Sequence, residues 1–514
     1  MRDALQCFRL WFAFKLIGYL VLACCSIGWP SRVRCEEARD RLVDALQHEI
    51  EQLRRAKEEQ EKRLDALEQE LRRLREGTAT PGATTPEQAL DRAIETTAPP
   101  TTKDQPPSVP VWGGTVAGVP LRLLDLSLDA LVAAGWSTAT DNDLNGRLQA
   151  GAHDPVRRGF TLQQAELSLV GAVDPYFVGE AHVLFSGHGA ELEEAFLTTS
   201  SLPYGLQVEA GLMLTEYGLL NPLHPHAWNW VDQAVVLSRL LGTEGLRSPG
   251  VRLGWLTPLP WFSEIHFGAQ NANQDEFTAS FLSSQAVGGR PATRSTTRSP
   301  TDLLYLVRWE NFWNLTSETG LLVGTNALHG PNSTGSDGRT LIYGADFKLR
   351  WRPQNNFRGW PFFLWQTEVH KRDYTAAYYL PPTDLADTAG RFPRHAGEPP
   401  DDEEILPSEP IPGAILRDVG FYTQALYGFR YGWAGGVRLE FAGGKGQSIG
   451  GRPQDPFRSD RWRVSPLLVW HPTEYSRLRL QYNYDRAQFL AEPSVHTVWL
   501  SAEILYGRHP AHKY

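Results

Sequence analysis

The chain has few cysteines, and all of them lie near its beginning. Cys7, Cys24, Cys25 and Cys35 are the only four in 514 residues. If the first 28 or 35 residues are removed as a signal peptide, at most one thiol remains and no internal disulfide can form. Disulfides stabilise many small secreted domains, so this fold must be held by other interactions, such as the hydrogen-bond ladder of a sheet.

Long hydrophobic runs are missing after residue 30. A membrane helix needs about 20 apolar residues, so the later chain is not a helical membrane protein. A β-barrel remains possible, because its strands need about ten residues that are apolar on one face only.

Sequence motifs for catalysis are missing as well. The chain has no Gly-rich phosphate loop, no His-Glu-x-x-His motif and no Gly-x-Ser-x-Gly motif. We therefore expect neither an enzyme nor a cofactor. The formal net charge of −9 also argues against a nucleic-acid partner.

Residues 1–35 have the pattern of a signal peptide. Arg2, Arg9 and Lys15 precede an apolar run over residues 16–27, which is long enough for the core of a signal and short for a membrane anchor. Residues 21–24 (Val-Leu-Ala-Cys) also match a lipoprotein signal, and this alternative stays open. Either signal predicts export from the cytoplasm.

Residues 36–76 carry a heptad repeat in which hydrophobic residues recur at alternating spacings of three and four residues. This spacing is typical of an α-helical coiled coil, and a single solvated helix is the alternative. Lys57 and Gln60 interrupt the apolar core and are candidates for setting the oligomeric state. We expect a periplasmic coiled coil that joins copies of the chain, as a trimer. Residues 77–118, rich in Thr, Pro and Ala, predict a flexible linker.

Residues 119–514 predict an all-β transmembrane barrel. Apolar and polar residues alternate in many short segments, as a strand with one apolar face requires, and 17 Trp and 17 Tyr suit the aromatic girdles of such barrels. Tight turns and long loops also alternate, which predicts both termini in the periplasm. About 16 antiparallel strands are expected, over residues 121–134, 158–173, 177–186, 190–200, 205–215, 249–257, 262–270, 302–313, 317–328, 340–352, 361–374, 416–430, 433–442, 460–470, 476–486 and 496–506.

Three segments resemble a group of Gram-negative outer-membrane proteins, some of them labelled zinc-regulated TonB-dependent receptors. These segments are residues 164–167, 171–176 and 221–228. The order of signal, coiled coil and sixteen strands is similar to that of phosphate-selective porins and DcaP-like trimeric porins. The resemblance implies a porin in the outer membrane. Tyr514 resembles the C-terminal aromatic signal of such barrels, although residues 507–513 separate it from the last predicted strand.

Charged residues on the predicted inner face of the strands are candidates for lining a pore. Acidic residues come from early strands and basic residues from later ones, which predicts an electric field across the lumen. The alternative is that they only solvate a polar interior. The candidates are Asp125, Asp129, Glu166, Glu180, Glu209, Lys348, Arg350, Arg438, Arg477 and Arg479.

The long connection over residues 216–248 is the candidate for a constriction loop. Its apolar runs suit a loop that packs against the barrel interior. The side chains expected at the constriction are His224, His226, Asp232, Arg239, Glu244 and Arg247. His224 and His226 also form a possible metal site, although two histidines without a defined third ligand are a weak signal.

The sequence therefore predicts an outer-membrane porin of a Gram-negative bacterium, a passive diffusion channel for small polar or charged solutes. Its partners would be outer-membrane lipid, further copies of itself and the solutes. One alternative is a receptor or transporter for a metal or another ligand. A TonB-dependent receptor, however, needs about 22 strands and a plug. The other alternative is a structural tether, in which the barrel only anchors the coiled coil.

Overall fold

The computed structural model describes residues 113–116, 119–122, 124–186, 189–381, 409–445 and 455–507. The predicted signal peptide, the predicted coiled coil and Tyr514 lie outside these residues, as does nearly all of the predicted linker. The last residues of that linker include strand β1 (Gly113–Val116), which pairs with β2 (Val119–Arg122) in a two-stranded antiparallel sheet. The domain boundaries before the barrel therefore stay predictions.

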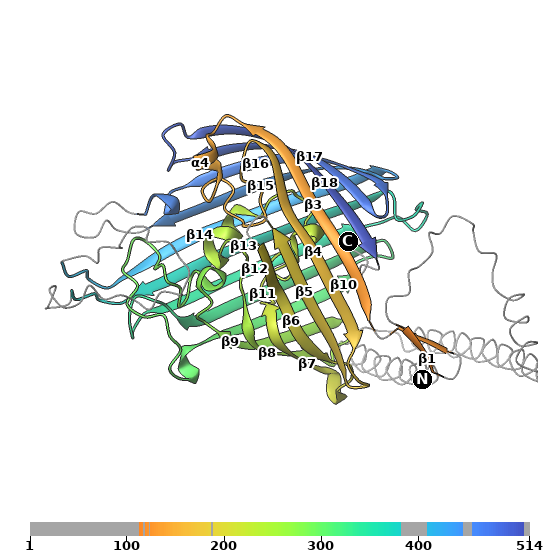
Figure 1. Ribbon diagram of the computed structural model, residues 1–514, viewed down its shortest axis with the longest axis horizontal. Coiled ribbons are helices and arrows are strands. Elements are labelled where there is room, and N and C mark those ends of the chain that lie inside the picture. Colours follow the sequence, from red (N-terminus) through yellow and green to blue (C-terminus); the bar gives the residue numbers. More distant parts are fainter. Residues whose placement is uncertain are drawn as a thin grey trace, which may run out of the picture. The chain divides into compact units, whose positions relative to one another are not determined.

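Sixteen strands form one closed antiparallel barrel (Figure 1). Each strand pairs with the next along the chain, and β18 pairs with β3 to close the ring. Every strand therefore has two neighbours, and no edge is left open for association with another sheet. The strands are β3 (Asp125–Ser137), β4 (Gly159–Ala172), β5 (Phe177–Ser186), β6 (Gly189–Thr199), β7 (Leu206–Leu214), β8 (Arg247–Leu256), β9 (Phe262–Asn271), β10 (Leu303–Asn314), β11 (Thr319–Pro331), β12 (Arg339–Trp351), β13 (Phe362–Ala376), β14 (Ala414–Arg430), β15 (Trp433–Lys445), β16 (Arg461–Thr473), β17 (Ser476–Ala487) and β18 (Ser494–Gly507).

This architecture confirms the prediction of a sixteen-stranded barrel. Each predicted segment overlaps one strand of the barrel, and no boundary differs by more than four residues. The predicted tight turns are also present. Tyr431 and Gly432, for example, are the only residues between β14 and β15, and Gly432 has a φ of 77°, a conformation that glycine adopts without strain.

Side chains alternate between the two faces of the barrel wall, as β17 illustrates. Leu480 and Tyr482 point outward and are 46% and 37% exposed, whereas Arg479 and Gln481 are 1% and 0% exposed. Most exposed large hydrophobic residues of the other strands also occupy outward positions. A closed barrel with an apolar outer face and a polar inner face is a transmembrane β-barrel.

The helical segments are short and lie in connections between strands. Helix α4 (Asp141–Leu144) follows β3, and α5 (Val235–Leu241) lies between β7 and β8. Thr140 caps α4, since its hydroxyl accepts a hydrogen bond from the backbone N–H of Asp143 at 3.2 Å. None of the helices in the described part of the chain is long and apolar enough to cross a membrane. The 3-10 turns are η1 (Pro203–Gly205), η2 (Pro225–Ala227), η3 (Asp275–Thr278), η4 (Pro300–Asp302) and η5 (Pro456–Arg458).

Replacing Leu480 by Arg tests the direction of the alternation in β17. The substitution places a charge against lipid, which costs about 2–4 kcal/mol near the midplane of the bilayer. We expect the free energy of unfolding, measured by urea titration in phospholipid vesicles, to fall by this amount. Tyr475→Arg, in the turn before β17, is the control, since a charge near the interface costs about 0–1 kcal/mol. Equal losses at both positions would mean that Leu480 does not face lipid.

Candidate functional site

One connection between strands runs through the interior of the barrel. It consists of residues 215–246, which join β7 to β8 and form what we term the inner loop. The backbone N–H of Leu220 donates to Glu368 Oε1 on β13 at 3.0 Å, and His226 Nδ1 lies 3.1 Å from Glu166 Oε2 on β4. Eight strands lie between β4 and β13 on one side of the ring and six on the other. The inner loop therefore crosses the lumen from wall to wall.

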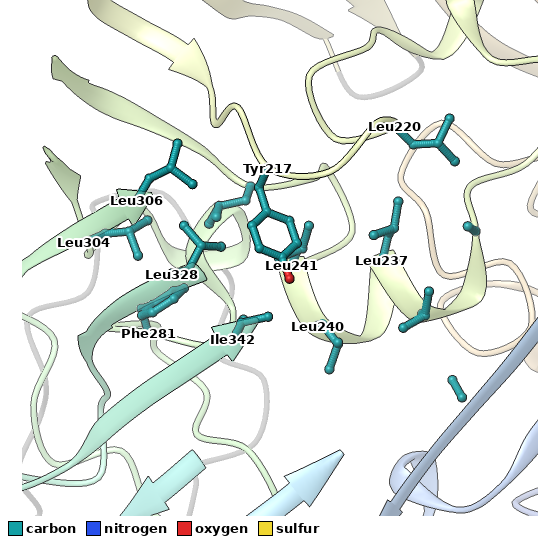
Figure 2. Packing of buried hydrophobic residues seen from close by; sticks show 14 of the residues in the cluster. Tyr217, Leu220, Leu237, Leu240, Leu241, Phe281, Leu304, Leu306, Leu328 and Ile342 are labelled. Atoms are coloured by element: carbon teal, nitrogen blue, oxygen red, sulfur yellow. The ribbon is translucent and has the colours of Figure 1, made fainter. Parts of the chain in front are cut away.

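The apolar part of the inner loop packs against one side of the lumen (Figure 2). Helix α5 buries Leu237, Leu240 and Leu241 in this cluster. Burying such a side chain stabilises a fold by about 1.5–3 kcal/mol, so the hydrophobic effect holds the loop inside the barrel. The partners of these three leucines in the cluster are Leu304 and Leu306 of β10, Leu328 of β11, Ile342 of β12 and Phe281 of the connection between β9 and β10.

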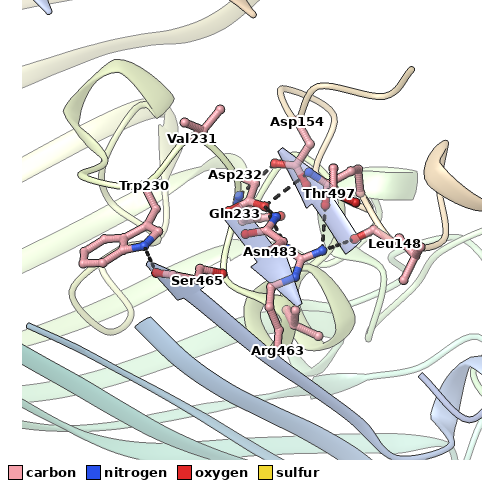
Figure 3. Close-up of polar contacts among 12 residues, drawn as sticks. Leu148, Asp154, Trp230, Val231, Asp232, Gln233, Arg463, Ser465, Asn483 and Thr497 are labelled. Carbon is pink, nitrogen blue, oxygen red and sulfur yellow. Dashed lines mark hydrogen bonds and ion pairs between the residues drawn. The ribbon is translucent and has the colours of Figure 1, made fainter. Parts of the chain in front are cut away.

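Asp232 attaches the inner loop to the wall formed by β15 to β17. Its carboxylate accepts a hydrogen bond from Arg463 Nη1 at 2.8 Å and forms an ion pair with Arg438, and both arginines are buried. Gln481 and Asn483 each donate to the same carboxylate at 2.8 Å. Asp232, Arg463 and Asn483 converge in Figure 3. Such charge-assisted bonds are about twice as strong as neutral ones, so Asp232 is a strong polar attachment of the loop.

Trp230 anchors the inner loop two residues before Asp232. Its Nε1 donates to the backbone oxygen of Ser465 at 2.9 Å (Figure 3). Arg479 Nη1 donates to the backbone oxygens of Trp228 and Trp230 at 3.1 Å and 3.0 Å. The loop is thus held at its backbone as well as at its side chains. The buried neighbours of the Trp230 ring are Phe362, Leu364, Leu426, Ala434, Leu467 and Val469.

The two predicted loop histidines lie in a buried cluster against strands β4 and β6. His224 Nδ1 is 3.2 Å from Glu166 Oε2 and 3.2 Å from Glu193 Oε2. The other ring nitrogen, Nε2, is 2.7 Å from Glu194 Oε2. The rings of His224 and His226 stack with their centroids 5.6 Å apart. At this end of the loop, the contacts of His224 with the wall are therefore histidine–carboxylate pairs.

Arg239 and Glu244 lie in the second half of the inner loop, and Arg247 lies beyond it. Arg239 Nη1 donates to the backbone oxygen of Ser459 at 3.1 Å. Glu244 Oε2 is 2.8 Å from His153 Nε2. Burial alone would lower the pKa of His153, but the Glu244 carboxylate raises that pKa above its ordinary value. Arg247 is the first residue of β8, not part of the loop as predicted, because its pairing with β7 extends the strand.

All ten predicted pore residues share the inward face of their strands, but their exposure differs widely. Five of them are at most 4% exposed, namely Asp129, Glu166, Arg438, Arg477 and Arg479. Glu209 is buried as well, whereas Asp125, Glu180, Lys348 and Arg350 are half-buried or exposed. The inner face is therefore in contact with water along part of the barrel and packed against loops along the rest.

The predicted separation of acidic and basic walls is weakened by carboxylates that sequence reasoning missed. Asp485 pairs with Arg463 at 2.9 Å, and Glu440 pairs with Arg438 at 2.9 Å. Glu503 forms an ion pair with Arg477 in the same way. These carboxylates occupy inward positions of β15, β17 and β18, so the alternation pattern itself could have identified them. The arginines are largely neutralised within their own wall.

Several of the less buried charged groups of the interior lie on the opposite part of the ring. The side chains of Glu180, Glu216 and Glu264 are 33%, 24% and 21% exposed. By comparison, the side chains of Arg438 and Arg463 are 2% and 1% exposed. Part of the inner face along β5 to β12, where Lys348 and Arg350 also lie, is therefore accessible to water.

Known proteins resemble this chain in sequence and, separately, in architecture. No protein-family model matches it. A protein of Aquifex aeolicus (strain VF5), described as uncharacterised, is 28% identical over 363 residues, which cover 70% of this chain and 71% of that protein.

The barrel is similar in architecture to solved structures of outer-membrane porins and channels. DcaP, an outer-membrane channel of Acinetobacter baumannii, has a TM-score of 0.44 and 12% identity over 74% of this chain and 97% of its own. The anion-selective porin from Comamonas acidovorans has a TM-score of 0.43 and 7% identity over 74% and 99%. Salmonella typhi OmpF has a TM-score of 0.44 and 10% identity over 77% and 100%.

Proposed function

We propose that the protein is an outer-membrane channel of the porin type, through which small polar or charged solutes diffuse passively. The observation that carries this proposal is the inner loop, which crosses a closed transmembrane barrel from wall to wall. A segment in that position determines how much of the lumen stays open. The partly exposed charges of Glu180, Glu216 and Lys348 and the exposed charge of Arg350 support a solute path along β5 to β12.

We also propose a location and an oligomeric state for the protein. An even number of antiparallel strands and an apolar outer face are typical of single-chain barrels in the outer membrane of Gram-negative bacteria. The predicted coiled coil at residues 36–76 would lie in the periplasm and join three copies of the chain. Of the alternative functions, a receptor or transporter for a metal has one observation in its favour, the cluster around His224.

Solute entry into proteoliposomes tests the channel proposal. We expect vesicles that contain the purified, folded protein to admit salts and small sugars, with entry slowing steeply as the sugar becomes larger, because the inner loop narrows the lumen. Protein-free vesicles and vesicles with the heat-unfolded chain are the controls. Entry no faster than in these controls would exclude a diffusion channel and leave a tether or a receptor.

A further inference from the structure

Buried negative charge gathers where the inner loop meets strands β4 to β6. The carboxylate side chains of Glu166, Glu193 and Glu194 are 0%, 2% and 9% exposed. In the described part of the chain, every ion pair of these three carboxylates is with a histidine. Isolated buried charges are strongly unfavourable, so protonated histidines or a bound cation must compensate these three carboxylates. The cluster is therefore suited to bind a cation.

Asp129 is a further buried carboxyl group beside this cluster. It lies opposite Glu166 in the register of β3 and β4 and is 2% exposed. Within the described residues, neither of its carboxylate oxygens has a hydrogen-bond partner. The neighbouring cation, Arg477, is already hydrogen-bonded to Glu503. A buried carboxylate without a partner is costly, and a cation bound beside Glu166 would reduce that cost.

Three side chains of the cluster bring possible ligand atoms close together. Glu166, His182 and His224 each offer one atom, and these atoms lie within 4.8 Å of one another. His182 Nδ1 is 3.1 Å from Glu166 Oε1, and His224 Nδ1 is 3.2 Å from Glu166 Oε2. A tetrahedral zinc ion with bonds of about 2.0–2.1 Å separates its ligand atoms by about 3.4 Å. Two imidazoles and a carboxylate are also ligands that zinc prefers.

The second nitrogen of His224 has the partner that a metal-bound histidine requires. Its Nε2 lies 2.7 Å from Glu194 Oε2. A ligating histidine usually donates its other N–H to a carboxylate, which leaves the first nitrogen as the ligand and fixes the ring. Here that partner directs Nδ1 toward Glu166. Glu193 Oε2, 3.2 Å from the same Nδ1, is a candidate for a fourth ligand.

We propose that Glu166, His182 and His224 form a binding site for a divalent transition-metal ion, with Zn²⁺ the best match. The sequence pattern pointed to His224 and His226, but the geometry adds Glu166 and His182 from β4 and β5 and leaves His226 beside the same carboxylate. The ion would bridge the inner loop and the barrel wall. This site does not depend on whether the barrel conducts.

Metal binding by the intact barrel tests the site. We expect the chelator-treated protein, without a histidine tag, to bind one Zn²⁺ per chain at micromolar or lower concentration in calorimetry. His182→Ala and His224→Ala should each weaken binding at least tenfold. His266→Ala is the matched control, because His266 is also buried and lies beside Glu264 and Glu310. Absence of binding by the intact protein, or loss of binding only in His266→Ala, would overturn the proposal.

A second measurement uses the unchanged protein, in case the variants do not fold. X-ray absorption of the zinc-loaded barrel should show scattering from two imidazole rings, and Co²⁺ in the same site should give the absorption bands of a four-coordinate ion. A metal shell without imidazole would assign the ion to another place and overturn the proposed ligands.

Discussion

Replacing Asp232 by Ala is expected to lower the free energy of unfolding by about 3 kcal/mol, the lower end of the usual cost of breaking a buried ion pair. The loss arises because Arg438 and Arg463 stay buried while their shared carboxylate is removed. Glu440 and Asp485 remain as partners of these arginines, which keeps the expected value from being larger. Urea titration of the protein in phospholipid vesicles measures the change.

Asp141→Ala is the matched control for this substitution. Asp141 forms an ion pair with Arg158 at 2.9 Å, but its side chain is 51% exposed. Surface pairs contribute about 0–1 kcal/mol, so this variant should unfold nearly like the unchanged protein. If Asp232→Ala lowers the free energy of unfolding no more than Asp141→Ala does, the contact between the inner loop and β15 to β17 contributes little to holding the loop.

The barrel could be predicted from the sequence because its signals are local. In β17 the alternation of Leu480 and Tyr482 with Arg479 and Gln481 assigns each side chain to a face without any knowledge of other strands. The tight turns and the long connections are also visible as sequence, and they fix the number and direction of the strands. None of these signals requires a contact between distant residues.

The partners of the inner loop could not be predicted in the same way. Asp232 is 206 residues from Arg438 and 251 residues from Asn483 along the chain. No sequence feature near one residue of such a pair identifies the other residue. The apolar runs of the loop were a local signal, and they predicted only that the loop packs against the barrel interior. Its attachment points depend on the closed ring, which brings β15 to β17 beside a loop that leaves β7.

Two irregularities in the strands could not be predicted from a strict alternation of inward and outward side chains. The register of β5 and β6 shifts between His182 and Val183, and as a result Glu193 and Glu194 are both buried although they are consecutive. A similar shift between β3 and β4 buries both Gln163 and Gln164. Alternation would have placed one residue of each pair outside. The candidate metal site was therefore only partly visible in the sequence.

Single-channel conductance of a chain without residues 222–246 is the most direct test of the inner loop as the element that limits passage. The deletion joins Asn221 to Arg247, and these lie near each other, because the backbone N–H of Leu246, the residue before Arg247, donates to Asn221 Oδ1 at 2.8 Å. Deletion of the exposed residues Ala491 and Glu492 is the control. We expect the loop deletion, in a folded barrel, to raise conductance severalfold and the control to leave it unchanged. A folded deletion variant with the conductance of the intact protein would contradict this role of the loop.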